Sequence, residues 1–229
     1  MSTPQVTLFC SGLAPNPLKV AILLEELGVS YKLIKKEFGD GENRVKAPSF
    51  LAINPNGRVP AIIDHTNSDK IVWESAAILL YVAEQFDNSG KYDGENLDEK
   101  AVIWEWLMFQ ISGLGPIQGQ VAHFKYYHPV KNLDQSVYDR FINETYRVFS
   151  VLEKRLEKQE WIALDRFTIA EVDINTGDML DMAFYPWLIG ASYMDLSFDS
   201  FPHLKAYVDR ISKIPSVETA YKQLQTAQT

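Results

Sequence analysis

Two stretches of sequence decide the fold: Asn54-Pro55-Asn56-Gly57-Arg58-Val59-Pro60-Ala61-Ile62-Ile63-Asp64 and Trp73-Glu74-Ser75-Ala76-Ala77-Ile78. The first is a loop that ends at Pro60, which belongs at a strand start or in a turn because proline cannot donate a hydrogen bond to a sheet. A cis bond before Pro60 would turn the loop sharply and leave the Val59 backbone free to pair with a ligand. The second stretch places Glu74 and Ser75 at a helix N-terminus, which attracts carboxylates. Together they predict a site for an extended, peptide-like ligand that carries an amine and a carboxylate.

The composition narrows the class of protein. The chain has 229 residues, of which 46% are hydrophobic, enough for one large domain or two small ones. A formal net charge of −8 argues against nucleic acid as a partner. We expect no membrane span and no leader. The single cysteine, Cys10, allows no intrachain disulfide and fits a reducing, cytoplasmic location.

The first 87 residues have the alternating pattern of an α/β domain. Apolar runs predict four strands, and helical spacing predicts two helices and a short helical turn between them. The order β-α-β-α-β-β-α favours a four-stranded mixed sheet with helices on its faces. The expected strands are 6–10, 31–36, 59–64 and 70–73, the helices 19–27 and 75–86, and the helical turn 47–53, with a hairpin around 67–69 and Gly28 closing the first helix.

The rest of the chain has helical periodicity throughout. Residues 88–98 are polar and rich in Gly, Asn and Asp, which is typical of a linker, and residues 99–229 form the predicted all-helical domain. Gly113, Gly115 and Gly119 are expected to break the first helix locally and to open room beside it. The expected helices are 97–127, 136–160, 181–189, 203–214 and 216–224.

The motifs taken together resemble those of cytosolic glutathione transferases, over nearly the whole length of the chain. The α/β part is similar to their thioredoxin-like domain and the helical part to their C-terminal domain. The Val-Pro and Glu-Ser pairs are shared by the superfamily, whereas the Pro-Asn pair and the Gly-Pro-Ile-Gln-Gly-Gln run resemble a fungal branch that includes a nitrogen-catabolite regulator with a prion extension, and the related bacterial nu class. The matching residues are 14–16, 54–64, 73–78, 112–120 and 122–124.

The resemblance implies glutathione as a substrate, with no metal. Ser75 would bind the γ-glutamyl carboxylate, Glu74 would pair with the γ-glutamyl amine, and Val59 would exchange backbone hydrogen bonds with the cysteinyl unit. Lys46 or Asn43 would reach the glycyl carboxylate. Ser75 alone would fit an ordinary helix cap, and Glu74 a favourable charge in a first turn; their combination with Val59-Pro60 favours a ligand site. The remaining residues expected at this site are Pro60 and Arg58.

The thiol of glutathione needs an activating group, because a free thiol has a pKa of about 8.5 and is mostly protonated at neutral pH. Ala14 occupies the position of the catalytic cysteine in omega-like classes, so no nucleophile stands there. Relatives in the branch place the residue at the position of Asn16 against the sulfur of glutathione, where the amide of Asn16 would donate a hydrogen bond to a thiolate. An asparagine between two prolines also suits a turn or a helix start. Cys10 lies in an apolar strand and is interpreted as a buried small side chain.

The electrophile is expected to bind between the domains, beside the first long helix. The candidates from this helix are partly aromatic, and aromatic residues at helical spacing are commonly core, so several of them are expected to be buried instead. His123 has no metal-binding partner at a recognisable spacing. The candidates are Phe109, Gln118, His123, Phe124 and Tyr127, with Trp106 and Gln110 also considered.

One departure from the family concerns the capping box of a buried C-terminal helix. Two segments have the pattern, 168–171 and 178–181, and residues 171–180 are interpreted as an insertion of about ten residues. Asp178 is the favoured N-cap, with Asp181 as its partner.

Two classes of function remain open from the sequence. The first is a detoxification-type glutathione transferase that conjugates a small hydrophobic electrophile or reduces a disulfide or peroxide, and the resemblance implies a homodimer. The second is a non-catalytic binding or regulatory protein on the same fold. Only residues 1–5 precede the first strand, without the Asn-rich extension of the nitrogen regulator, which favours the enzyme.

Overall fold

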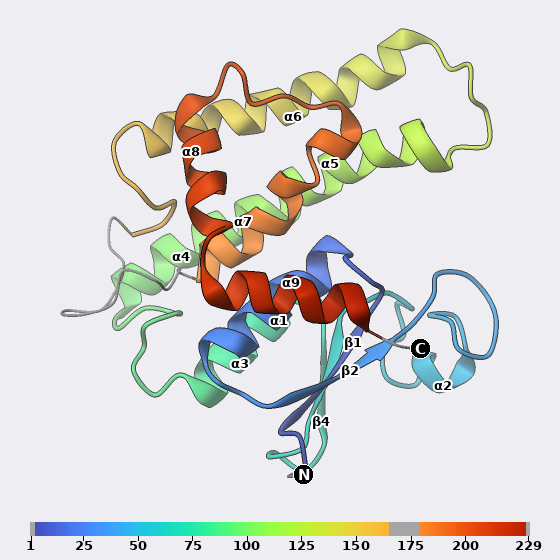
Figure 1. The fold of residues 1–229 in the computed structure, drawn as a ribbon, viewed down its shortest axis with the longest axis vertical. Helices are drawn as coiled ribbons and strands as arrows, with labels where there is room; N and C mark the ends of the chain where they lie inside the picture. The colour runs from blue at the N-terminus through green and yellow to red at the C-terminus, as the bar shows by residue number, and fades with distance from the viewer. Residues whose placement is uncertain (1–2, 165–178, 228–229) are drawn as a thin grey trace.

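The structure is a computed structural model that describes residues 3–164 and 179–227 (Figure 1). An α/β half is followed by a helical half, as the sequence pattern predicts. The elements of the first half are β1 (Val6–Cys10), α1 (Pro15–Glu26), β2 (Tyr31–Lys35), α2 (Pro48–Leu51), β3 (Ala61–Asp64), β4 (Lys70–Trp73) and α3 (Ser75–Phe86).

The four strands form one mixed sheet in the order β2-β1-β3-β4. β1 pairs in parallel with β2 and antiparallel with β3, and β3 pairs antiparallel with β4. The last pair is the predicted hairpin, whose turn is made possible by positive φ angles at Ser68 and Asp69. Both predicted fold classes, a thioredoxin-like sheet domain and a helical domain, are therefore present.

Helix α1 begins four residues earlier than the predicted Lys19. Pro15 stands at its start, where a missing N–H costs nothing and a fixed φ suits the helix. Pro17 also lies in this first turn, so Asn16 is the one residue of the first three with a backbone N–H. Residues 15–18, which the prediction left outside the helix, thus form its N-terminus. At the other end, Gly28 adopts φ +62°, the conformation that favours glycine after a helix.

The helical half contains one long interrupted helix followed by shorter ones. Its elements are α4 (Leu97–Phe109), η1 (Gln110–Leu114), α5 (Gly115–Ala122), η2 (His123–Tyr127), α6 (Gln135–Leu156), α7 (Met179–Ile189), η3 (Ser192–Met194), α8 (Pro202–Ile211) and α9 (Pro215–Thr226). The predicted N-cap Asp178 and the predicted insertion at 171–180 lie largely outside the described residues.

The glycine-rich part of the long helix widens rather than breaks, contrary to the sequence prediction. η1 is a π-helical turn in which the backbone N–H of Gly115 donates to the carbonyl of Gln110, five residues earlier. Pro116 follows directly; it has no N–H for the next α-helical bond, and its ring crowds the preceding turn. The wider π turn accommodates this proline and keeps the helix continuous, and such turns are frequent at functional sites.

A single apolar core joins the two halves. It includes Leu8 of the sheet, Leu23 of α1, Leu107 of α4, Phe184 of α7 and Leu224 of α9, all fully buried. α1 packs against α3, α7 and α9, and Figure 1 shows α9 lying across α1. The shared core therefore joins α1 of the first half to α7 and α9 of the second.

The other face of the sheet has a smaller core beneath α2. It consists of Phe9, Val45, Phe50, Val59 and Ala61. Val59 therefore anchors the loop before β3 by its side chain. Among the described residues, no helix is long and apolar enough to cross a membrane.

Candidate functional site

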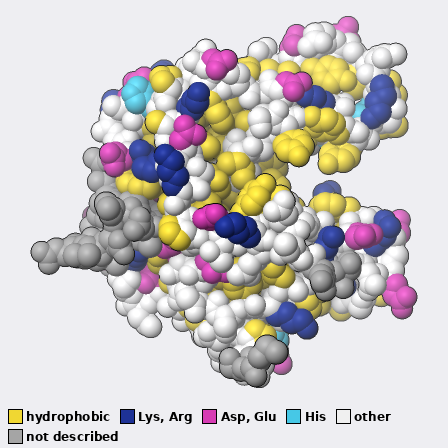
Figure 2. Space-filling model, viewed as in Figure 1, with side chains coloured by type: hydrophobic (Ala, Val, Ile, Leu, Met, Phe, Trp, Pro, Cys, Tyr) yellow, Lys and Arg dark blue, Asp and Glu magenta, His cyan; other side chains and the backbone are white. Residues whose placement is uncertain are grey.

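A cleft of about 810 Å³ lies between the two halves. Its walls come from the N-terminal parts of α1 and α3 on one side and from the α4–η1–α5–η2 helix with α7 on the other. Figure 2 shows the molecule deeply hollowed between its two halves, with hydrophobic side chains gathered along the inner wall. The volume is in the upper part of the range of small-molecule sites, so the cleft has room for a peptide-sized ligand and part of a second molecule.

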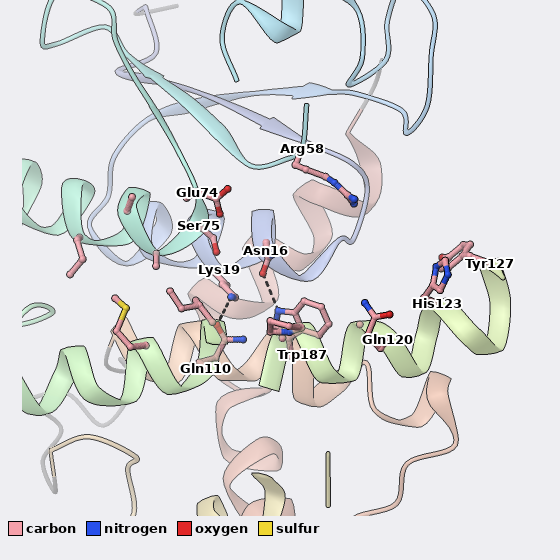
Figure 3. Close-up of a pocket in the computed structure, with 18 residues that line it drawn as sticks. Asn16, Lys19, Arg58, Glu74, Ser75, Gln110, Gln120, His123, Tyr127 and Trp187 are labelled. Carbon is pink, nitrogen blue, oxygen red and sulfur yellow. Dashed lines mark hydrogen bonds between the residues drawn. The ribbon is translucent and has the colours of Figure 1, made fainter. Parts of the chain in front are cut away.

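The start of α3 forms one end of the cleft (Figure 3). Glu74 is the residue before the helix and has φ +73° and ψ +122°, a strained conformation for a residue with a side chain. This conformation directs the exposed Glu74 carboxylate to the cleft, where Asn56 Nδ2 donates to Glu74 Oε1 at 3.3 Å. Ser75, 6% exposed, is the first residue of the helix. An anion here would meet a hydroxyl and the free N–H groups of the first turn.

The loop before β3 is held by side chains that the sequence analysis did not single out. Asn54 is buried; its Nδ2 donates to the carbonyl of Arg58 at 2.7 Å, and its Oδ1 accepts from the N–H of Asn56 at 3.0 Å. Gly57 has φ +60°, and a Cβ there would lie 2.8 Å from the carbonyl oxygen of Val45. The Val59-Pro60 bond is cis. These contacts hold the loop so that Arg58 lines the cleft.

Asn16 lies at the N-terminus of α1 and faces the helical half (Figure 3). The indole Nε1–H of Trp187, on α7, donates to Asn16 Oδ1 at 3.0 Å. Because an indole N–H only donates, the amide atom that faces it must be the oxygen. The amide NH₂ of Asn16 is therefore turned away from Trp187 and is free to donate to a ligand atom.

Lys19 lies one turn further along α1 and is 1% exposed. Its Nζ donates to Oε1 of Gln110, the first residue of the π turn, at 2.6 Å. Burial lowers the pKa of Lys19 from 10.5 to about 7, and the nearby Glu74 carboxylate opposes this shift. The cleft thus has a buried amine at its floor and an exposed carboxylate at its rim.

The structure brings together part of the predicted site. Asn16, Arg58, Glu74, Ser75, His123 and Tyr127 all line the cleft. Val59, Pro60, Lys46 and Asn43 do not. Lys46 Nζ donates to the carbonyl of Asn56 at 3.0 Å, so in this structure it braces the loop from outside. Asn43 is exposed in the loop after β2.

Among the residues predicted for the electrophile site, Phe109, Gln118 and Phe124 do not line the cleft. Of the two residues also considered there, Gln110 lines the cleft and Trp106 does not. Phe109 packs against Trp106 and Phe184 inside the helical half. Gln118 is fully buried, with Nε2 donating to the carbonyl of Trp187 at 2.7 Å. Phe124 stacks on Phe141 of α6. Helical spacing alone does not show which side of a helix meets a neighbouring helix and which meets the cleft.

The sequence analysis missed Lys19 and Trp187. The one available signal for Lys19 was a lysine within the apolar run Leu18-Lys19-Val20-Ala21, where a charge has to be buried or paired. Nothing in the sequence around Trp187 pointed to Asn16, 171 residues earlier. Cys10 is fully buried as predicted, and burial raises its pKa to about 11, which makes it a poor nucleophile.

One group of described residues outside the cleft has the donor atoms of a metal site. Side-chain atoms of Glu153, Glu157 and His203 lie within 4.8 Å of one another. The Glu153 carboxylate already accepts hydrogen bonds from the backbone N–H groups of His203 and Leu204 and from His203 Nδ1. This carboxylate therefore caps the N-terminus of α8.

Comparison with known proteins finds a matching family model for each half of the chain. Residues 4–84 match the family model of the glutathione S-transferase N-terminal domain, and residues 116–215 match that of the C-terminal domain. Among solved structures, the glutathione transferase URE2P8 from Phanerochaete chrysosporium, solved with oxidized glutathione, superposes with a TM-score of 0.86 at 32% identity, covering 98% of this chain and 96% of that one.

Two curated fungal relatives show how far the similarity extends. Protein URE2 of Eremothecium gossypii is 41% identical over 216 residues, which is 90% of this chain but 59% of that protein, so the chain spans little more than half of that relative. Glutathione S-transferase 2 of Schizosaccharomyces pombe is 35% identical over 238 residues, 96% of each chain. With both domain models, the fold and the full-length relative in agreement, this chain belongs to the glutathione S-transferase family, in its fungal Ure2-related branch.

Proposed function

We propose that this protein is a glutathione-dependent enzyme that activates the thiol of glutathione in the cleft between its halves. The observation that carries the proposal is the hydrogen bond from Trp187 Nε1 to Asn16 Oδ1 at 3.0 Å. This bond leaves the Asn16 amide NH₂ free to donate to sulfur at the N-terminus of α1. A thiolate there also benefits from the positive end of the helix dipole, which lowers thiol pKa values.

The charges of the cleft suit the two ends of glutathione. Ser75 and the first turn of α3 are placed for the γ-glutamyl carboxylate, and the exposed Glu74 carboxylate for the γ-glutamyl amine. Arg58, which lines the cleft, is the cation we assign to a carboxylate of the ligand. Lys46 or Asn43 would reach the glycyl carboxylate after movement of the loop that carries them. The oxidized glutathione bound by URE2P8 of Phanerochaete chrysosporium supports a ligand of this class.

A stabilised thiolate supports two reactions. In conjugation, the sulfur attacks an electrophilic carbon and forms a thioether, and a leaving group such as chloride departs from that carbon with its bonding electron pair. In reduction, the sulfur attacks one sulfur of a disulfide and forms a new disulfide, or attacks an oxygen of a peroxide and forms a sulfenic acid. The S–S or O–O bond breaks, and the leaving thiolate or alkoxide is protonated. The wall formed by α5, η2 and α7 would hold the second substrate, with His123 and Tyr127 at the mouth of the cleft (Figure 3). The proposal includes a homodimer, which the resemblance implies, and a cytoplasmic location, which a single cysteine fits.

The test compares Asn16→Ala with the wild type in two assays. Glutathione affinity is measured by calorimetry, and turnover is measured with a mixed disulfide of glutathione and with 1-chloro-2,4-dinitrobenzene. Removing one preorganised donor to a developing anion costs about a hundredfold in rate, so we expect kcat/KM to fall about a hundredfold while affinity changes little. Asn88→Ala, which removes an exposed asparagine in the turn after α3 and outside the cleft, is the matched control.

The outcomes separate an enzyme from a binding protein. Unchanged turnover in Asn16→Ala would remove Asn16 as the activating group. Tight glutathione binding by the wild type without turnover of either substrate would identify a binding protein on this fold. Failure of the wild type to bind glutathione would overturn the whole proposal.

A further inference from the structure

Lys19 is the most unusual charged residue of the cleft. It lies on the face of α1 that enters the shared core, and it is 1% exposed, whereas lysines are almost never fully buried without a partner. The partner found here, Gln110 Oε1 at 2.6 Å, is a neutral dipole and not a carboxylate. Burying an ammonium group against a neutral partner leaves most of its charge uncompensated.

The π turn that presents Gln110 is equally unusual. Gln110 is fully buried, and its Nε2 has no hydrogen-bond partner among the described residues, because Oε1 is turned to Lys19. An unpaired buried amide costs free energy and is uncommon in cores. The Gln110 amide thus holds the Lys19 amine at the floor of the cleft while its own Nε2 stays without a hydrogen bond among the described residues.

Lys19 lies close to the place where a thiolate would sit. It follows Asn16 by three residues, so both side chains lie on the same face of α1, and both line the cleft (Figure 3). The charged or titratable groups that face this space from the other elements are Glu74 before α3, Arg58 in the loop before β3, and His123 and Tyr127 of η2. α7 contributes Trp187 and η1 contributes Gln110, both neutral. Figure 3 shows His123 and Tyr127 at the far end of the cleft from Asn16.

Asn16 alone does not supply everything that stabilises a thiolate. A neutral amide donates a hydrogen bond to a thiolate but adds no charge to balance it. We propose that the Lys19 ammonium group supplies this charge and stabilises the thiolate of bound glutathione, with Gln110 orienting the amine. This inference rests on the proposed function, since it concerns the same bound thiol.

The coupling between the two groups follows from linkage. A cation that stabilises a thiolate is stabilised by it to the same degree, so binding of glutathione raises the pKa of Lys19 while Lys19 lowers that of the thiol. When Lys19 is neutral before binding, ionisation breaks the S–H bond, leaves the electron pair on sulfur and adds the proton to the amine. The pair then titrates as a unit, and the ammonium–thiolate form persists across neutral pH.

The test measures the pKa of bound glutathione from the ultraviolet absorbance of its thiolate near 240 nm. An opposite charge a few ångströms away shifts a pKa by one unit or more, so Lys19→Met should raise the thiol pKa by about one unit and lower the fraction of thiolate about fivefold at pH 6.5. Lys19→Gln retains a donor for Gln110 but no charge and should behave as Lys19→Met. Lys19→Arg retains the charge and should keep a lowered thiol pKa.

S-methylglutathione separates charge from shape because it has no ionisable thiol. We expect the neutral variants to bind it within about twofold of the wild type. A thiol pKa unchanged in both neutral variants overturns the role of Lys19 while leaving the proposed function intact, and so does a raised pKa in Lys19→Gln that is accompanied by lost S-methylglutathione binding. Failure of the wild type to bind glutathione overturns the proposed function itself.

Discussion

The two walls of the cleft are built in different ways. The α3 wall depends on neighbours in sequence: Glu74 and Ser75 are adjacent, and their geometry comes from one strained turn and a helix start. The opposite wall depends on contacts across the chain, since Gln110 meets Lys19 from 91 residues away and Trp187 meets Asn16 from 171 residues away. The local wall is suited to binding the ends of a ligand, and the long-range wall to controlling the chemistry at its centre.

Glu74→Gln should give the largest loss of glutathione affinity and tests the local wall. It removes the charge that pairs with the ligand amine while keeping the size of the side chain. Hydrogen bonds to charged groups contribute about 1.5–3 kcal/mol, so glutathione affinity should fall about fiftyfold, or about 2.3 kcal/mol, by calorimetry. kcat at saturating glutathione should change less than the affinity, because the hydrogen bonds at the α1 end of the site are kept.

The matched control is Glu84→Gln, which removes an exposed carboxylate from the last turns of the same helix. A comparable loss of affinity in the control would mean that overall charge matters and not the pairing at Glu74. A fall in kcat larger than the fall in affinity would break the division between the two walls.

The pH dependence of stability tests the burial imposed by the helical half. The pKa of Lys19 is about 7 in the folded protein, against an ordinary value of 10.5, because burial disfavours the charged form. Between these values the unfolded chain binds a proton that the folded protein does not, so stability rises with pH. Below pH 7 both states are protonated and the full penalty of burying the charge is present.

We therefore expect unfolding in urea to show a Lys19-dependent gain of about 2 kcal/mol between pH 7 and pH 9. Lys19→Met should lack this gain, whereas Lys205→Met, which removes an exposed lysine of α8, should retain it. The same rise in the wild type and in Lys19→Met would show that the amine is solvated and not buried.

Trp187→Phe should give the smallest effect and tests the long-range wall. Without the indole N–H, the Asn16 amide loses the contact that fixes its orientation, and part of the population turns its oxygen to the thiolate. kcat/KM should fall about tenfold, about 1.4 kcal/mol, with the glutathione Kd within about twofold. Trp104→Phe, at an exposed position of α4, is the control. Equal loss of affinity and rate in Trp187→Phe would instead assign Trp187 to the shape of the cleft.

Local patterns predicted the fold well because each element carries its own stereochemistry. Alternation of strands and helices identified the four-stranded sheet, and the turn at 67–69, Gly28 and the Glu-Ser helix start all lie where the pattern placed them. The predictions were wrong where contacts with other parts of the chain, or a neighbouring proline, determine the local structure. The start of α1 was placed late because two prolines in one turn are typical of a loop, and the widening at Gln110 was predicted as a break because glycines were weighed without Pro116.

The sequence by itself determined which residues begin helices, which turns are tight and which segments are apolar, because these depend on backbone freedom within a few residues. It therefore placed Ser75, Glu74 and Asn16 at helix N-termini or close to them. Only the tertiary structure decided which face of each helix lines the cleft, that Phe109 and Phe124 pack between helices, and that Lys19 is buried against Gln110. Burial and pairing depend on the whole fold, since the desolvation of a charge is set by every element packed around it.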